Sequence, residues 1–190
     1  ANSTTVSDFA IIRYNSDGSI DTSFGTAGKV FTSFTPTSQD YAQDVALQID
    51  GKIVVSGNSN ASFAAARYNP DGSLDTGFGV SGTATVSLAN NTNNNNAVAI
   101  QPDGKIVLAG SLVASSPPQN PQYLMGLARF SSNGVLDMSF DADGIATAAF
   151  GEFVICNDIA IQADGKIVAA GAVSLISGAS LDLALVRFTS

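Results

Sequence analysis

One short motif recurs at regular intervals along this chain, and this repetition constrains the fold more than any other feature. An apolar run ends in an arginine that is followed by an aromatic residue, as in Phe9-Ala-Ile-Ile-Arg13-Tyr14. The motif returns roughly every 60 residues, which is a period typical of propeller and solenoid repeats. Every arginine of the chain occupies this one position: Arg13, Arg67, Arg129 and Arg187.

Two further motifs keep the same period. A turn and an Ile/Leu-Asp pair follow the first three arginines; the turn is Asp17-Gly18, then Asp71-Gly72, and in the third, degenerate copy Asn133-Gly134. Half a period away, the run Gln-x-Asp-Gly-Lys-Ile-Val begins at Gln48, Gln101 and Gln162. Asp-Gly pairs favour tight turns because both residues tolerate positive φ angles. The flanking Val, Ile, Phe and Thr residues favour strands, and no segment shows helical spacing.

Each period therefore predicts four short antiparallel strands, which is the composition of a β-propeller blade. In the second period, the first strand covers 44–48, and the second begins at Lys52 and Ile53. The third strand ends at the arginine, and residues 28–32 are an example of the fourth strand. We predict an all-β fold of about three blades plus partial ends, with thirteen strands.

We assign residues 1–190 to a single repeat domain with four parts. A partial blade at 1–35 precedes blades at 36–88 and 89–150, and a second partial blade covers 151–190. Propellers close with four to eight blades, so three blades and a surplus strand do not obviously close. The alternatives are a piece of a longer array, copies that assemble into a ring, or an open structure with exposed edges.

Composition excludes several classes of function. Acidic residues outnumber basic ones, 16 to 8, and the basic residues are scattered, so we expect no nucleic-acid partner. No apolar run reaches the roughly 20 residues of a membrane helix, so we expect no membrane insertion. The absence of His excludes His-dependent triads and His-ligated zinc. Cys156 is the only cysteine, so it cannot form an internal disulfide and is expected to pack as a small hydrophobe.

The combined motifs resemble the delta-sixty tandem repeat, a bacterial β-propeller repeat family of unknown function. The resemblance covers nearly the whole chain, and the third period departs from the pattern at Asn133 and Asp141. It implies a large, secreted or surface-attached bacterial protein with many tandem copies. It implies no activity, cofactor or catalytic residue. We expect an extracellular or cell-surface location, with no signal peptide in this chain because its first residues lack a basic and an apolar region.

The repeated charged residues have structural and functional interpretations. We interpret Arg13, Arg67, Arg129 and Arg187 as structural repeat residues, each paired with a loop aspartate. The lysines of the Asp-Gly-Lys turns are expected to point into solvent. Oxygen ligands at alternate positions of the Asp-Gly loops resemble part of a calcium loop, but no Glu stands where a bidentate ligand is needed. We favour a turn-forming role, and the weak calcium candidates are Asp17, Asp21, Asp71 and Asp75.

The connections on the other side of the blades differ in every period. Variable loops on a rigid scaffold are common recognition sites, although loops of this kind are also tolerated insertions. The candidate binding residues on these loops are Asn91, Asn93, Asn95, Pro118, Asn120 and Tyr123.

Together these features predict a non-enzymatic β-propeller repeat module of a secreted or surface bacterial protein, which binds a protein or a glycan through its variable loops and needs no cofactor. The alternative is a structural or filament-forming array, joined through open blade edges that permit self-association. A third hypothesis is an Asp-based hydrolase or lyase, which would require an aspartate with a raised pKa in a cleft.

Overall fold

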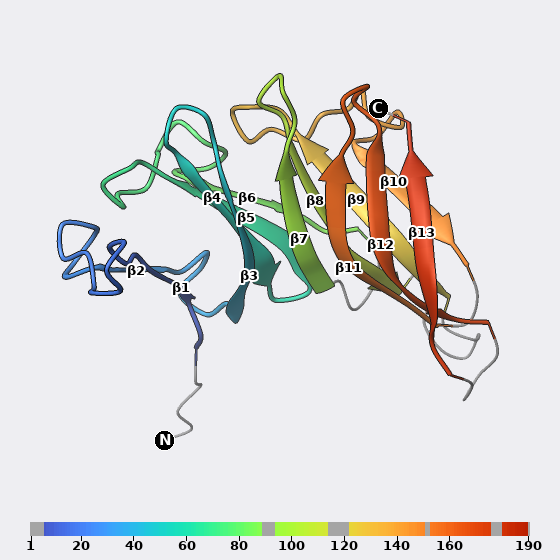
Figure 1. Ribbon diagram of the computed structural model, residues 1–190, viewed down its shortest axis with the longest axis horizontal. Helices are drawn as coiled ribbons and strands as arrows, with labels where there is room; N and C mark the ends of the chain where they lie inside the picture. Colours follow the sequence, from blue (N-terminus) through green and yellow to red (C-terminus); the bar gives the residue numbers. More distant parts are fainter. Residues whose placement is uncertain (1–5, 89–93, 114–121, 151–152, 176–179, 190) are drawn as a thin grey trace.

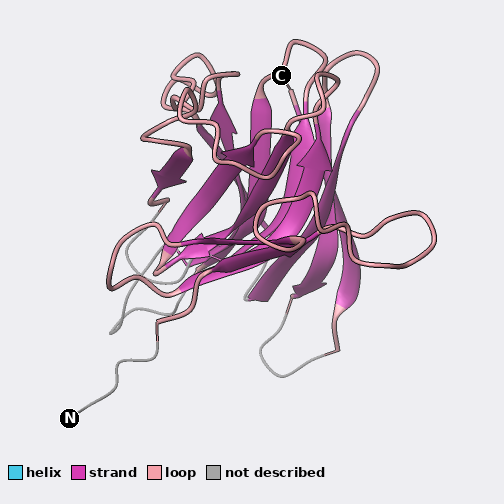
Figure 2. Cartoon of the chain, turned by 90° about the vertical axis from the view of Figure 1, so that its left-hand side faces the viewer, coloured by secondary structure: helices cyan, strands magenta, loops and turns pink. Residues whose placement is uncertain are grey.

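The computed structural model describes residues 6–88, 94–113, 122–150, 153–175 and 180–189, and within them the chain forms thirteen strands and no helix (Figures 1 and 2). No described segment forms a helix that could cross a lipid bilayer. The strands are β1 (Phe9–Ile12), β2 (Lys29–Thr32), β3 (Asp40–Leu47), β4 (Ile53–Ser59), β5 (Ser62–Tyr68), β6 (Thr83–Val86), β7 (Asn94–Ile100), β8 (Ile106–Val113), β9 (Tyr123–Phe130), β10 (Ile145–Ala149), β11 (Phe153–Ile161), β12 (Ile167–Ser174) and β13 (Asp182–Phe188).

These strands form four antiparallel sheets that follow one another along the chain. The sheets are β1-β2, β3-β4-β5-β6, β7-β8-β9-β10 and β11-β12-β13. They stand side by side as an open row that does not close into a ring, with β1-β2 at one end and β11–β13 at the other (Figure 1). The all-β prediction of four-stranded propeller blades with partial ends is confirmed. We call these units sheets 1 to 4 in chain order.

The Asp-Gly turns form as the sequence predicts. In sheet 2, Gln48 N donates to Lys52 O over 2.9 Å, and Gly51 has a φ of 82°. The equivalent bonds, from Gln101 N to Lys105 O and from Gln162 N to Lys166 O, close the other two turns. Because glycine adopts positive φ at no steric cost, the chain reverses direction at each turn, and the second strand pairs antiparallel with the first.

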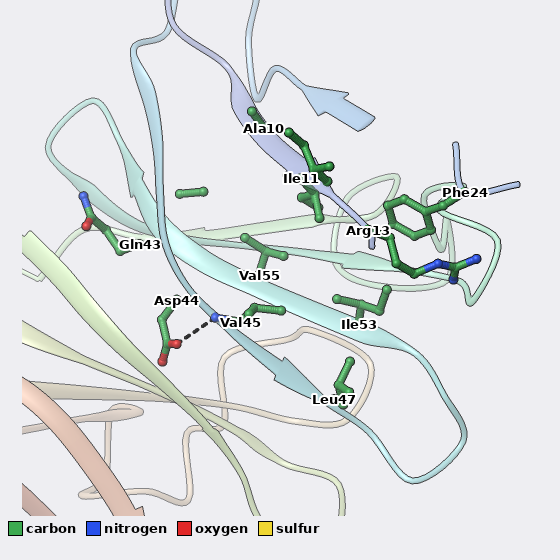
Figure 3. Close-up of a pocket in the computed structure, with 12 residues that line it drawn as sticks. Ala10, Ile11, Arg13, Phe24, Gln43, Asp44, Val45, Leu47, Ile53 and Val55 are labelled. Carbon is green, nitrogen blue, oxygen red and sulfur yellow. Dashed lines mark hydrogen bonds between the residues drawn. The ribbon is translucent and has the colours of Figure 1, made fainter. Parts of the chain in front are cut away.

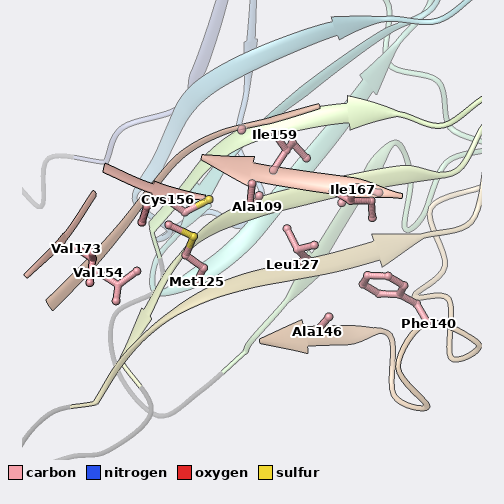
Figure 4. Close-up of a cluster of buried hydrophobic side chains, with 14 residues drawn as sticks. Ala109, Met125, Leu127, Phe140, Ala146, Val154, Cys156, Ile159, Ile167 and Val173 are labelled. Carbon is pink, nitrogen blue, oxygen red and sulfur yellow. The ribbon is translucent and has the colours of Figure 1, made fainter. Parts of the chain in front are cut away.

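The hydrophobic core lies between consecutive sheets rather than inside any one of them. Three clusters of buried side chains fill the three spaces, and the cluster between sheets 3 and 4 includes Met125, Leu127 and Cys156 (Figure 4). The middle strands β4 and β5 are buried along nearly their whole length, since a neighbouring sheet covers each face. Cys156 is fully buried here, in agreement with its expected packing as a small hydrophobe.

The first strand of sheet 2 differs from the sequence prediction. Strand β3 begins at Asp40, four residues before the predicted start, because a register shift between Ala42 and Asp44 interrupts the alternation of side chains. Equivalent shifts occur at Asn95/Ala97 in β7 and at Cys156/Asp158 in β11. Such a β-bulge places one extra residue in the strand, so a period-2 pattern read from the sequence stops there.

Candidate functional site

Two of the repeated arginines, Arg13 and Arg67, lie at the boundaries between sheets, where each contacts a carboxylate, an aromatic ring and a backbone carbonyl. Arg67 Nε donates to Asp75 Oδ2 over 2.8 Å, and the guanidinium lies 4.7 Å from the centre of the Phe78 ring. Its Nη1 donates to the backbone carbonyl of Ser132 in the next sheet's turn. We call the Arg, Asp and Phe of each repeat, together with the next sheet's turn, a clamp.

The same clamp occurs between sheets 1 and 2. Arg13 Nε donates to Asp21 over 2.8 Å, the guanidinium lies 4.5 Å from the Phe24 ring, and Nη1 donates to Pro70 O. A backbone bond from Gly25 N to Asp71 O, 2.8 Å long, accompanies it. Arg-carboxylate and Arg-aromatic contacts of this kind require the planar guanidinium, so the arginine position is used to join consecutive sheets.

The third arginine repeats the part of the clamp that lies within its own sheet. Arg129 Nε donates to Asp137 over 2.9 Å and its guanidinium lies 4.5 Å from the Phe140 ring. Arg187 occupies the same position in β13, where it is exposed. The Arg187 side chain makes no hydrogen bond or ion pair within the part of the chain that the structure describes.

The lysines of the Asp-Gly-Lys turns were expected in solvent, and for two of them this expectation is wrong. Lys52 Nζ lies 2.8 Å from Asp75 Oδ2, and Lys105 Nζ lies 3.2 Å from Asp137 Oδ2. Each lysine side chain is about 30% exposed, because the turn that carries it packs beside the loop that carries the aspartate. Each aspartate therefore accepts from one lysine and one arginine. Lys166 instead pairs with Asp164 of its own turn.

The weak calcium candidates are occupied by contacts within the protein. Asp17 Oδ1 accepts from the backbone N and the hydroxyl of Ser19, at 2.9 and 2.6 Å, and Asp71 makes the same pair with Ser73. Asp21 and Asp75 are bound by the arginines described above. The bonds of Asp17 and Asp71 to the serines are those of Asx turns. The described residues contain no group of three or more side chains suited to hold a metal ion.

Shifted aspartate pKa values lie in one direction throughout the described residues. Hydrogen bonds from Ser139 and Lys105, together with the positive charge of Arg129, hold the pKa of Asp137 well below its usual range. Lys52 is the main cause of the lowered pKa of Asp75, and Ser23 that of Asp21. A general acid at neutral pH requires the opposite shift.

Two of the six candidate binding residues on the variable loops, Asn95 and Tyr123, lie within the described residues. Asn91, Asn93, Pro118 and Asn120 lie outside the described residues. Asn95 lies in β7 opposite Gly110. Tyr123 begins β9 and is half-buried, with its ring centre 5.0 Å from that of Phe153 in an edge-to-face contact. Tyr123 thus contributes to the packing between sheets 3 and 4.

A groove that the sequence reading did not single out lies between sheets 1 and 2. It has a volume of about 470 Å³ and is lined mainly by aliphatic side chains of β1, β3 and β4, including Ile11, Val45 and Leu47 (Figure 3). Strand β1 forms one wall, and β2 is its only sheet partner in the described chain. The strands that correspond to β1 in sheets 2 to 4 are the third strands, β5, β9 and β13. Along the edge that faces away from the fourth strand, each of them pairs with the second strand of its sheet. The groove thus occupies the place where sheets 2 to 4 have their first two strands, and the two-stranded part predicted at 1–35 was the signal that could have revealed it.

Two comparisons with known proteins bear on identity. No curated protein matches the chain. One family model matches residues 1–24, 48–78, 101–140 and 162–190, which together exceed half of the chain and include all four arginine motifs. The chain belongs to the family described as a domain of unknown function (DUF5122) beta-propeller.

Proposed function

We propose that this chain is a non-enzymatic β-propeller module that binds an extended protein segment in the groove beside β1. The proposal includes an extracellular or cell-surface location in bacteria and the finer assignment to the delta-sixty type of tandem repeat. The observation that carries it is the edge of β1, Phe9–Ile12, which pairs with no other described strand and lies beside an apolar groove, because exposed strand edges bind extended peptides by adding a strand.

The chemistry of the groove favours a protein segment over a glycan. Val45 and Leu47 are 57% and 73% exposed, and both side chains face the groove (Figure 3). A strand that pairs with β1 would cover them. Burial of apolar side chains stabilises such a complex by about 25 cal/mol per Å², and main-chain hydrogen bonds to β1 would fix the direction of the segment.

The pairing inside sheet 2 supplies the model for the bound segment. There Val54 lies opposite Arg67 and Gly57 opposite Ala64, and these two positions correspond to Arg13 and Ala10 of β1. We therefore expect the groove to select a segment with Val or Ile opposite the arginine and a small residue opposite Ala10. The charged groups of the neighbouring clamps are paired internally, which supports a non-enzymatic role for them.

A labelled peptide with the sequence of residues 52–58 tests the proposal. Fluorescence anisotropy should show saturable binding to the 190-residue chain, and a peptide with proline in place of Val55, the residue opposite Ile12, should bind at least about tenfold more weakly because proline cannot donate to the ladder. Leu47→Asp should weaken binding at least about tenfold, whereas Ile49→Asp, at a fully exposed position outside the groove lining, should leave it unchanged. Equal binding by both peptides, or by the chain with and without Leu47→Asp, would overturn the proposal.

A structural array joined through open edges is the second candidate function. Strand β13 supports it, because within the described chain its only sheet partner is β12, whereas the third strands of sheets 2 and 3 are paired on both sides. The variable-loop binding of a protein or glycan remains a part of the first candidate that rests on sequence alone.

A further inference from the structure

The two ends of the row of sheets expose positions that are buried everywhere else. The strands that end at or next to the repeated arginines in sheets 1 to 3 are β1, β5 and β9. On these strands Phe9, Phe63 and Met125 face the following sheet and are fully buried. Leu183 occupies the same position in β13 and is 81% exposed. Two residues further on, Leu185 is 60% exposed, whereas its equivalents in sheets 2 and 3, Ala65 and Leu127, are fully buried.

The opposite end shows the matching pattern on its other face. Tyr68 and Phe130 face the preceding sheet and are buried, and the Tyr68 hydroxyl donates to Thr32 Oγ1 over 2.7 Å. Tyr14 holds this position in sheet 1 and is 59% exposed. The same comparison applies to Ile12, which is exposed where Ala66 of sheet 2 is buried.

The polar part of the clamp is divided between the same two ends. Arg187 extends from the outer face of sheet 4 at the position from which Arg67 reaches the next turn. The turn of sheet 1, residues 15–18, carries the carbonyl of Ser16 at the position of Pro70 and Ser132, the two acceptors used by Arg13 and Arg67. Gly18 in this turn has open space beside its Cα, whereas Gly72 of the next turn packs against the Phe24 ring.

We propose that the outer face of sheet 4 in one copy binds the outer face of sheet 1 in a second copy, in the way that consecutive sheets bind within the chain. Leu183 and Leu185 would pack against Tyr14 of the second copy, and Arg187 would donate to the carbonyl of Ser16. The existing junctions between sheets 1, 2 and 3 are the precedent, since each joins the same two repeat positions.

The arrangement of the chain favours a second copy over closure of one copy on itself. The two faces lie at opposite ends of the longest axis of the molecule (Figure 1). The contact is head to tail, so it generates either a closed ring or an open filament. Two copies contribute eight sheets, four from each, which is within the range of four to eight blades found in closed propellers.

Light scattering coupled to size exclusion tests the proposal on the 190-residue chain. We expect a mass above the 19.3 kDa of one copy, with a concentration-dependent return to that mass on dilution. Twice this mass corresponds to the ring and unlimited growth to the filament, and both support head-to-tail binding. A constant mass of one copy up to about millimolar concentration would overturn the proposal.

Two variants make the test specific for the head-to-tail contact. Leu185→Asp alters only the sheet 4 face and Tyr14→Asp only the sheet 1 face, and each should raise the dissociation constant at least about tenfold. Mixed in equal amounts, the two variants should associate again, because each retains the face that the other has lost. A contact between two identical faces predicts the contrary result, since one of the variants would then dimerise alone.

Matched controls separate this contact from folding and from the groove. Ile49→Asp places the same charge at a fully exposed position away from both end faces and should leave the mass unchanged. Circular dichroism should show native strand content in all three variants, since each altered side chain is mostly exposed. Neither Leu185 nor Tyr14 lines the groove, so peptide binding there should survive both substitutions. If Leu185→Asp and Tyr14→Asp self-associate like the unaltered chain, the proposed faces are wrong.

Discussion

At the scale of single residues, the clamp arginines join sheets by combining a charge pair, a ring contact and a backbone hydrogen bond. Arg67 and Arg13 make the same set of contacts, but their side chains are 9% and 35% exposed. Removal of Arg67 leaves the mostly buried Asp75 with Lys52 as its remaining ion-pair partner among the described residues, and loss of a partner costs more at a buried site than at an exposed one. Arg67 and Arg13 therefore allow a comparison of the same contacts at a buried and at a more exposed position.

We predict that Arg67→Ala lowers the free energy of unfolding by about 3 kcal/mol and Arg13→Ala by about 1 kcal/mol. Urea unfolding followed by circular dichroism measures both. Arg67→Lys should recover only part of the loss, because an ammonium cannot contact Asp75, Phe78 and Ser132 at once. Equal losses for Arg67→Ala and Arg13→Ala would show that burial of the clamp does not matter.

The clamp aspartates also set the response to acid. The folded-state pKa values of Asp75 and Asp137 lie below their usual range, so the folded state binds fewer protons than the unfolded state near pH 4. Their contribution is complete above the unfolded pKa of about 3.9 and is lost as the pH falls through the folded value. We predict a free energy of unfolding that is level above about pH 5 and declines below pH 4. Asp137→Asn should be less stable at pH 7 and should decline less steeply in acid, as measured by urea unfolding across a pH series; parallel curves for the two chains would contradict this assignment.

At the scale of the elements, the glycine opposite each bulge permits a close approach of two strands. A Cβ at Gly57 would lie 1.9 Å from Tyr41 O, and one at Gly171 would lie 1.8 Å from Ile155 O. Both obstacles are backbone atoms of the bulged strand, which cannot move as a flexible side chain can. The bulges in β3 and β11 thus depend on the absence of a side chain in the facing strand.

We predict that Gly57→Ala destabilises the protein by about 2–3 kcal/mol, the usual cost of overpacking a core. Gly77→Ala is the matched control, since its Cβ would meet only the Asp75 side chain at 3.4 Å, and it should change stability by less than about 0.5 kcal/mol. Thermal unfolding measures both variants. A loss for Gly57→Ala no larger than that for Gly77→Ala would show that the bulge relaxes without cost.

Strands and turns were predictable from the sequence because they depend on neighbours in the chain. The Asp-Gly-Lys turn and the apolar run after it define β4 locally, and the repeat shows the same pattern three times. The extra residue of each bulge was not predictable, since its effect depends on the strand opposite. The pairing of Lys52 with Asp75 was also missed, because two separate turns must pack together before those side chains meet.

At the scale of the whole molecule, stability should vary along the row of sheets. A repeat protein is stabilised by each unit and by its contacts with neighbours, and the end sheets have a neighbour on one side only. Strands β4, β5, β8 and β9 are largely buried, whereas β1, β2 and β13 alternate between buried and exposed positions.

We predict that amide hydrogen exchange is slowest in β4, β5, β8 and β9 and fastest in β1, β2 and β13. Exchange measured by mass spectrometry at a protein concentration low enough to keep single copies apart tests this order. Uniform protection across all thirteen strands would mean that the row unfolds as one cooperative unit.

The direction of the clamp has a consequence for how such chains change over evolutionary time. Arg13 and Arg67 reach forward to the turn of the sheet that follows, so one period of the sequence carries a donor for the next period and an acceptor for the previous one. Duplication or loss of a gene segment that spans whole periods leaves every remaining donor beside a suitable acceptor. Lineages can therefore lengthen or shorten the chain by recombination without new contacts having to arise, while a break within a period separates the two halves of a junction.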